Sequence, residues 1–223
     1  MSGLCAELTY FANVPHCESS LFAFLELVLL VFLFAVTITL CNGKGGSGKT
    51  TLTILLASAL AEAGHQVAVR DTDAQKTATR WIDESASLPL AEDGKTYSAL
   101  FIDTPPRLES SEFSDAVRQA NVVVVVSSPS PADLFTSRDT VMALENLGVR
   151  ERAHLLFNQV QPGTILSRDL EEMAQRIGLP VLKSRVQRRQ AYQHAVVMGW
   201  KSLPSEAREE IFKIALEITA LAK

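Results

Sequence analysis

Short apolar runs and longer amphipathic segments alternate along the chain. The runs rich in valine, isoleucine and leucine predict β-strands, and the segments between them predict helices. The strands are expected at residues 36–41, 66–70, 97–102, 121–126 and 153–157, with a further extended segment at 179–182. The helices are expected at residues 52–63, 76–84, 111–120, 129–146, 165–177, 189–198 and 204–222.

This alternation is typical of an α/β fold with a mostly parallel sheet that helices cover on both faces. The strand at residues 121–126 contains five consecutive valines, which predicts a central strand buried on both sides. No repeat, low-complexity tract or linker interrupts the sequence after this pattern begins. We therefore expect one domain over residues 36–223, preceded by a hydrophobic extension at residues 1–35.

A glycine-rich motif joins the first predicted strand to the first predicted helix. Residues 43–51 read GKGGSGKTT, which satisfies the phosphate-loop pattern G-x-x-x-x-G-K-[ST] between a strand and a helix. Glycines let backbone N–H groups converge on anionic oxygens, and the helix directs its positive end to the same point. Lys49 is expected to reach the β- and γ-phosphates and Thr50 to bind magnesium. The expected nucleotide contacts from this loop are Gly43, Lys44, Gly45, Gly46, Ser47, Gly48, Lys49, Thr50 and Thr51.

Three aspartates follow predicted strands, where ligands of an open α/β sheet bind. Asp103 comes after a hydrophobic run, as in a Walker B motif, so its carboxylate is expected to hold magnesium directly or through water. The alternative is an aspartate that caps a turn before Pro105. Asp71 and Asp73 are two residues apart at a strand end, so their side chains point the same way. Two converging carboxylates are reasonable beside a divalent cation.

The loop holds a second lysine, Lys44, in the form K-G-G-x-G-K-T-T. With this feature the sequence resembles the deviant Walker A ATPases of the ParA/MinD type. Residues 127–134, SSPSPADL, are similar to the P-x-T-P-S-x-L-D-L segment of that family. Residues 186–192, VQRRQAY, resemble the Q-R-Q-x-Y stretch of its small ParA-like members, which lack an N-terminal DNA-binding domain. The resemblance covers residues 36–223.

The resemblance implies a P-loop ATPase fold, with ATP and Mg2+ as cofactors. It implies that Lys44 reaches the nucleotide of the partner subunit in an ATP-bound homodimer, and that Asp73 positions the attacking water while Asp71 lies near the metal. The catalytic set would then be Lys44, Lys49 and Asp73, and the metal set Thr50, Asp71 and Asp103. Asn158 matches the position that reads the adenine edge; the alternative is a turn-forming asparagine. The family's D-x-D-P-Q has Ala74 here instead of proline, which puts the rigidity of that loop in doubt.

Charge is distributed unevenly around a formal net charge of −4. Residues 1–149 carry 9 Lys and Arg against 17 Asp and Glu, whereas residues 150–223 carry 12 against 8. Four cations lie within seven residues of the basic part, without an acid among them: Lys183, Arg185, Arg188 and Arg189. Such a patch predicts salt-sensitive, sequence-independent DNA binding. The alternatives are a solvated basic turn or arginines at a dimer interface.

The three cysteines show no metal-ligand spacing and no disulfide framework, which fits a reducing cytoplasm. Residues 21–40 are largely apolar, but residues 36–41 are needed as a strand, and a spanning helix takes about 20 residues. We therefore expect no stable membrane insertion. The segment at residues 1–35 is interpreted as a dispensable extension or an artefact of the assigned start, with a functional chain that starts at or near Val36.

The sequence thus favours a cytoplasmic, nucleoid-associated partition ATPase that binds DNA without sequence preference as an ATP dimer and is stimulated by a ParB-like or other small partner. A MinD-like positioning ATPase is the main alternative, although its membrane helix would be basic, whereas the helix at residues 204–222 carries several acids. A bacterial tyrosine kinase would need a C-terminal tyrosine cluster, and an iron–sulfur reductase would need cysteines after Cys41. A nucleotide-binding scaffold with negligible hydrolysis also stays open.

Overall fold

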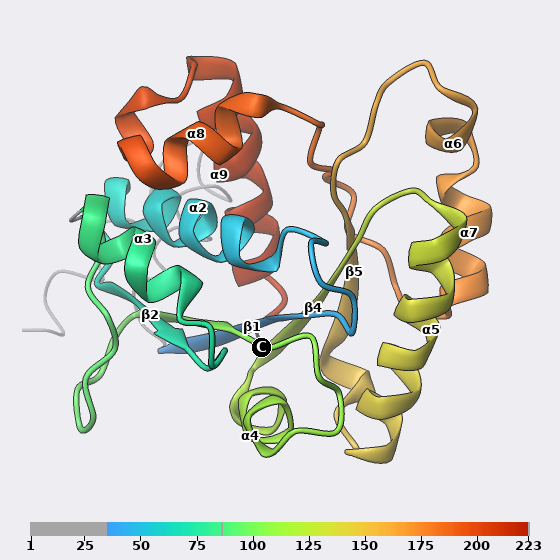
Figure 1. Ribbon diagram of the computed structural model, residues 1–223, viewed down its shortest axis with the longest axis horizontal. Coiled ribbons are helices and arrows are strands. Elements are labelled where there is room, and N and C mark those ends of the chain that lie inside the picture. The colour runs from blue at the N-terminus through green and yellow to red at the C-terminus, as the bar shows by residue number, and fades with distance from the viewer. Residues whose placement is uncertain (1–34, 86, 223) are drawn as a thin grey trace, which may run out of the picture. The chain divides into compact units, whose positions relative to one another are not determined.

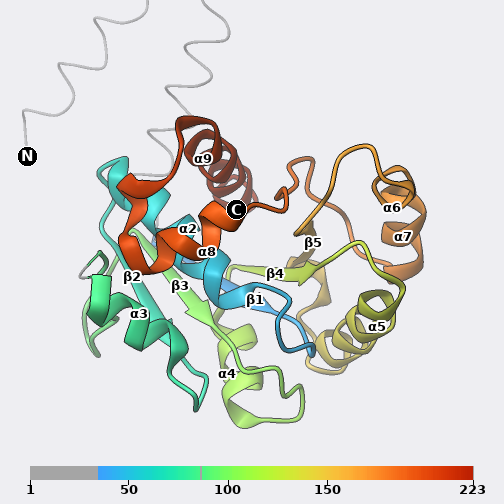
Figure 2. The same ribbon diagram turned by 45° about the horizontal axis from the view of Figure 1, so that its top comes forward.

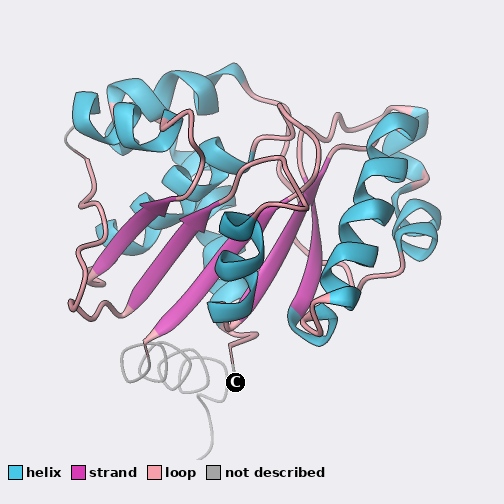
Figure 3. Cartoon of the chain, turned by 60° about the horizontal axis from the view of Figure 1, so that its bottom comes forward, coloured by secondary structure: helices cyan, strands magenta, loops and turns pink. Residues whose placement is uncertain are grey.

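The structure is a computed structural model, and it describes residues 35–85 and 87–222. The described residues form a five-stranded sheet in the order β2-β3-β1-β4-β5, and every pairing in it is parallel. The strands are β1 (Val36–Cys41), β2 (Val67–Asp71), β3 (Ala99–Asp103), β4 (Val122–Ser127) and β5 (Ala153–Phe157). Helices lie along both faces of this sheet (Figure 3). The predicted α/β class is therefore confirmed.

The first strand of the motif, β1, occupies the middle of the sheet. It pairs with β3 on one side and β4 on the other, with Leu40 opposite both Asp103 and Val124. Chain order changes direction at this strand, because β2 and β3 lie on one side and β4 and β5 on the other. A crevice at the carboxyl ends of the strands beside such a switch point is where open α/β sheets bind ligands.

Helices from both ends of the sequence cover one face of the sheet (Figures 1 and 2). They are α2 (Lys49–Glu62), α3 (Thr77–Ser85), α8 (Gln190–Met198) and α9 (Ser205–Thr219). Buried leucines of α2 and isoleucines of α9 belong to a single apolar cluster with side chains of β1, β3 and β4. The α2 helix therefore packs against both the sheet and the last helix, which fixes the position of the loop at its start.

The opposite face is covered by α4 (Ser111–Gln119), α5 (Pro131–Asn146) and α7 (Leu170–Ile177). Alternate valines of β4 pack into this second cluster together with Phe113 and Leu144. All five valines of β4 are 0–1% exposed, which confirms the predicted central, doubly buried strand. Short elements complete the described chain: η1 (Arg150–Arg152), α6 (Ile165–Arg168) and η2 (Trp200–Ser202).

Two predicted elements differ from the structure. The helix expected at residues 165–177 is divided into α6 and α7, because the backbone of Asp169 leaves helical geometry at φ −94° and ψ 11°. The extended segment at residues 179–182 makes only an isolated bridge to Leu155 through Val181. Pro180 lacks the N–H group that a longer ladder would need, so this segment does not become a sixth strand of the described sheet.

The interpretation of residues 1–35 as an extension concerns a segment that lies, up to residue 34, outside the described residues. The start-site hypothesis stays a prediction for the same reason. Among the described helices, none combines the length and the apolar character needed to cross a membrane.

Candidate functional site

The loop from Gly43 to Gly48 leaves the carboxyl end of β1 and leads directly into α2. Two of its glycines have left-handed backbone geometry, with φ 77° at Gly46 and φ 96° at Gly48. A Cβ atom on Gly48 would lie 2.2 Å from Nδ2 of Asn158, so a side chain has no room there. The sequence therefore has glycine where the left-handed backbone requires it. In this conformation the N–H groups of the loop before the helix can point together at a bound anion.

Lys49 is the first residue of α2 and is 6% exposed. Its Nζ donates a hydrogen bond to the backbone O of Lys44 at 2.9 Å, so the side chain folds back over the loop. Burial lowers the pKa of Lys49, while the nearby Asp103 carboxylate opposes that shift. The loop thus positions a largely desolvated ammonium group where a phosphate would compensate its charge.

Thr50 and Asp103 form the candidate metal position. The Thr50 hydroxyl donates to Oδ2 of Asp103 at 2.7 Å. Asp103 is 1% exposed, and its Oδ1 has no hydrogen-bond partner among the described residues. Burial raises the pKa of Asp103 to about 7, although the hydrogen bond from Thr50 opposes the shift. A buried carboxylate with one free oxygen beside a hydroxyl fits a hard divalent cation, whose charge would lower this pKa again.

The other two aspartates of the predicted set lie next to this pair but are engaged differently. Asp71 is opposite Asp103 in the β2–β3 register. Its Oδ1 accepts the N–H of Asp73 at 3.0 Å, and its Oδ2 accepts both the N–H and the hydroxyl of Thr79 at 2.9 and 3.0 Å. Asp71 therefore fixes the start of α3 in this structure, and its metal role stays a prediction.

Asp73 is partly exposed, and its Oδ1 accepts only the N–H of Gln75, at 2.9 Å. Among the described residues, no group of three or more His, Cys, Asp or Glu side chains gathers in a way that could hold a metal ion. A magnesium ion at Thr50 and Asp103 would therefore complete its shell with phosphate oxygens and water, as this ion usually does.

Lys44, the second lysine of the loop, forms an ion pair with Asp133 at the start of α5. Asp133 is 1% exposed, and Ser128 and Ser130 also donate hydrogen bonds to its carboxylate. Burial raises the pKa of Asp133, but the hydrogen bonds from Lys44 and the two serines outweigh it, so the net pKa is lowered. The ammonium group of Lys44 is thus held within its own chain, while its side chain stays 39% exposed.

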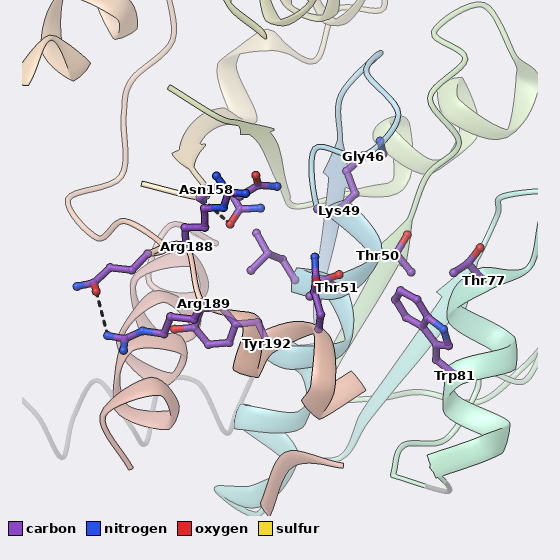
Figure 4. A pocket seen from close by; sticks show the side chains of 15 residues that line it. Gly46, Lys49, Thr50, Thr51, Thr77, Trp81, Asn158, Arg188, Arg189 and Tyr192 are labelled. Carbon is purple, nitrogen blue, oxygen red and sulfur yellow. Dashed lines mark hydrogen bonds between the residues drawn. The ribbon is translucent and has the colours of Figure 1, made fainter. Parts of the chain in front are cut away.

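Asn158 follows β5 and lies against the phosphate loop, where its Nδ2 donates to the backbone O of Ser47 at 2.8 Å. A cavity of about 330 Å³ extends from this point along the start of α2. Figure 4 shows Lys49 and Thr50 in the middle of the cavity, with Thr77 and Trp81 of α3 on one side and Arg188, Arg189 and Tyr192 on the other. The predicted nucleotide contacts Gly46, Gly48, Lys49, Thr50, Thr51 and Asn158 are among its lining residues.

The four basic residues predicted to contact DNA differ in their surroundings. Arg188 and Arg189 line the cavity next to the phosphate loop. Lys183 and Arg185 are exposed and are not among the residues that line it. Arg189 forms an ion pair with Glu210 at 3.3 Å, whereas Arg188 makes no ion pair with any described residue. The DNA role of these residues stays a prediction; Lys183, Arg185 and Arg188 are exposed, and Lys183 and Arg185 are the two that lie outside the cavity lining.

Sequence reasoning did not identify several residues of this site. Trp81 belongs to the helix predicted at residues 76–84, to which no site residue was assigned, and it forms a wall of the cavity. Asp133 was part of the quoted segment SSPSPADL, but nothing in the sequence indicated its pairing with Lys44, 89 residues away. Glu210 is one of the acids of the predicted last helix, and its bonds to Gln187, Arg189 and Tyr192 were not predicted.

A phosphate loop of this geometry, at the switch point of a parallel sheet, defines a P-loop nucleotide-binding protein. The model of the CbiA family, the CobQ/CobB/MinD/ParA nucleotide binding domain, matches residues 38–199. The chain belongs to this family, and the resemblance to ParA/MinD-type proteins is confirmed.

Three similar proteins describe the neighbourhood of the chain within the family. The "Maintenance of carboxysome distribution protein A" of Halothiobacillus neapolitanus is 28% identical over 178 residues, which cover 71% of this chain and 82% of the relative. A putative plasmid partition protein of Borrelia burgdorferi, solved with AMPPNP, superposes with a TM-score of 0.66 at 16% identity, over 82% of this chain and 97% of that one. The MinD cell division protein of Aquifex aeolicus gives a TM-score of 0.66 at 18% identity, over 81% and 95%. The two structures share the fold.

Proposed function

We propose that this protein is a magnesium-dependent ATPase that dimerises when it binds ATP and positions a cellular cargo. One observation carries the proposal: the phosphate loop contains two lysines with different environments. Lys49 is buried over its own loop, as a phosphate-binding lysine should be. Lys44 is partly exposed, and its ammonium group is held by Asp133 of the same chain.

The arrangement around Lys44 supports a switch between two states. An ammonium group paired with a buried carboxylate is compensated in the single chain, and leaving that partner costs least where another anion takes its place. The triphosphate of a second copy is such an anion. Dimerisation with ATP would then exchange the pair of Lys44 and Asp133 for a contact between Lys44 and the nucleotide of the partner subunit, once in each direction of a symmetric dimer.

Positioning is a better-supported role than plasmid partition. The Halothiobacillus relative, which covers most of both chains, is named for maintaining carboxysome distribution. The Borrelia protein with a plasmid-partition name is 16% identical and supports the fold alone. We therefore place the MinD-like positioning alternative ahead of partition. The cargo would be selected by a partner protein, a small protein that is expected to stimulate hydrolysis.

DNA binding is the second part of the proposal. The exposed cations Lys183 and Arg185 would contact phosphates without sequence preference, so that the ATP dimer uses DNA as its track in the cytoplasm. A role confined to nucleotide binding is the alternative for Arg188 and Arg189, because both line the cavity.

Single-turnover hydrolysis of ATP with Mg2+ tests the proposal, with Asp73→Ala as the informative variant. Asp73 is expected to position the attacking water and makes no contact with the loop lysines in the hydrogen bonds described above. Asp73→Ala should therefore keep ATP affinity and lose hydrolysis by about 10²-fold or more. If Asp73→Ala hydrolyses ATP at the wild-type rate, Asp73 does not position the attacking water. If the wild-type protein binds ATP but does not hydrolyse it, the scaffold alternative is favoured.

A further inference from the structure

A short segment closes the nucleotide cavity on the side away from α3. We call residues 183–189 the strap. Gln187, Arg188 and Arg189 of the strap line the cavity, whereas Lys183 and Arg185 do not. Figure 4 shows Arg188 and Arg189 on the side of the cavity opposite Trp81. The strap is thus a wall of the cavity at a distance from the phosphate-binding N–H groups.

One edge of the strap is hydrogen-bonded to the residues that follow β5. The N–H of Val186 donates to the O of Phe157 at 2.9 Å, and the N–H of Val160 donates to the O of Val186 at 2.9 Å. The N–H of Arg188 donates to the O of Val160 at 3.0 Å. Asn158 lies within this partner segment, so the strap and the residue predicted to read adenine are fixed relative to each other.

Two glutamates of α9 hold other N–H groups of the strap. Glu217 accepts the N–H groups of Lys183 and Ser184 at 2.6 and 2.9 Å. Glu210 accepts the N–H of Gln187 at 2.8 Å. These carboxylates accept hydrogen bonds from backbone N–H groups that have no neighbouring strand to bond to. Because the acceptors are charged, such hydrogen bonds are strong. The wall therefore depends on α9 for its position.

Glu210 also organises the side chains of the wall. Its Oε1 accepts the hydroxyl of Tyr192 at 2.7 Å, and its Oε2 accepts from Nη2 of Arg189 at 3.3 Å. The same nitrogen of Arg189 donates to Oε1 of Gln187 at 3.0 Å. Burial and the hydrogen bond to Glu210 raise the pKa of Tyr192 well above its usual value, so the hydroxyl remains a donor. A single carboxylate thus fixes Gln187, Arg189 and Tyr192, all three of which line the cavity.

The phosphate loop and the strap side of the cavity differ in chemistry. The converging N–H groups, Lys49 and Thr50 make the loop, in the middle of the cavity, suitable for the phosphates and their cation. The strap side, next to Asn158, brings amide, guanidinium and aromatic groups that suit the ribose and base. Given the ATP binding proposed above, we infer that Glu210 is a positioning residue for the nucleoside half of the nucleotide. It is not among the lining residues, so it acts through the groups that it holds.

Comparing two ligands separates this role from a general effect on the fold. ATP would contact both the loop and the strap side of the cavity, whereas inorganic tripolyphosphate would contact only the loop. Titration calorimetry of the full chain with each ligand would compare wild type, Glu210→Gln and Glu209→Gln. Glu209 is the matched control, because it is the adjacent glutamate on α9 and is exposed, with Lys213 as its ion-pair partner at 2.7 Å.

Glu210→Gln replaces one of the two carboxylate oxygens, which face Arg189 and Tyr192, by an NH2 group. It also removes the negative charge of the ion pair with Arg189. We expect about a tenfold loss of ATP affinity, the effect of losing one hydrogen bond to a charged group. Tripolyphosphate affinity should stay at the wild-type value, and Glu209→Gln should match wild type for both ligands. Tyr192→Phe, which deletes only one donor to Glu210, should reduce ATP affinity by about threefold and spare tripolyphosphate.

Three results would overturn the inference. ATP affinity at the wild-type value in both Glu210→Gln and Tyr192→Phe would show that the network does not position the nucleoside. An equal loss for ATP and tripolyphosphate would show that Glu210 supports the site as a whole rather than one half of it. Wild-type protein that binds neither ligand would instead overturn the proposed nucleotide binding, and the inference with it.

Discussion

At the scale of single residues, Gly48 is the most constrained position of the phosphate loop. Its φ of 96° is unfavourable for any residue with a side chain, and a Cβ atom would meet Nδ2 of Asn158 at 2.2 Å. The hydrogen bond from this Nδ2 to Ser47 at 2.8 Å shows how closely the asparagine packs on the loop. Asn158 can therefore occupy its position only because residue 48 has no side chain, so the loop conformation and the position of Asn158 depend on each other.

Gly48→Ala should reduce ATP affinity by at least about tenfold and lower the free energy of unfolding by roughly 1–3 kcal/mol, because Asn158 must move and the backbone is strained. Gly64→Ala is the control, since Gly64 lies outside the loop at a similar φ of 90° and no atom lies within 4 Å of its would-be Cβ. Calorimetric titration and denaturant unfolding measure the two effects. Equal behaviour of the two variants would contradict the packing described for Asn158.

The residues that sequence patterns could identify are those whose chemistry depends on short spacing. Lys49, Thr50 and Asp103 belong to a loop motif and a strand end, and the structure brings all three together. The partners of these groups could not be predicted, because they come from distant parts of the chain. Asp133 lies 89 residues from Lys44, and Glu210 lies 23 residues from Gln187 across a helix and a turn.

At the scale of elements, apolar periodicity predicted strands more closely than helices. β1 and β5 begin and end at the predicted residues, because a parallel strand buried on both faces is a continuous apolar run with polar limits. The helix predicted at residues 204–222 is present as α9, and its Ile211, Ile214 and Ile218 are buried. From the sequence, its acids served only as an argument against a basic membrane helix, yet Glu210 and Glu217 accept N–H groups of the strap. Periodicity does not report which polar groups find partners.

Truncation of Ile214 tests the packing of α9. Ile214 is fully buried in the cluster that also contains leucines of α2. Ile214→Ala should lower the free energy of unfolding by about 2–5 kcal/mol, because it removes buried methyl groups and leaves a cavity. Met142→Ala on α5 is the control, as its side chain is 62% exposed, and it should change stability by no more than about 0.5 kcal/mol. Urea unfolding of both variants distinguishes a packed helix from a loosely attached one.

At the scale of the whole molecule, the parallel sheet was predictable but the strand order was not. Alternating strands and helices indicate right-handed crossovers, and several orders of five strands satisfy that rule. The observed order β2-β3-β1-β4-β5 places β1 at the switch point and so explains why the loop after β1, rather than another loop, carries the motif. Within the basic segment, which is contiguous in sequence, Arg188 and Arg189 line the cavity while Lys183 and Arg185 lie outside it.

This division makes a prediction about DNA. Lys183→Glu combined with Arg185→Glu should weaken binding equally on unrelated DNA sequences and reduce the salt slope by about 1 for each DNA phosphate that the variant no longer neutralises. ATP affinity should not change, because neither residue lines the nucleotide cavity. Lys95→Glu, an exposed substitution in the acidic part of the chain, is the control. Unchanged DNA affinity at several salt concentrations in the double variant would exclude this surface.

The central claim is that Lys44 makes the ATP state dimeric. Its most direct test is the molecular mass in solution, measured by light scattering with Mg2+ and a non-hydrolysable ATP analogue, for wild type and Lys44→Ala. Wild type should be a dimer with the analogue and a monomer without it. Lys44→Ala should bind the analogue through the intact Lys49 and remain a monomer. A Lys44→Ala protein that dimerises as fully as wild type would contradict the account.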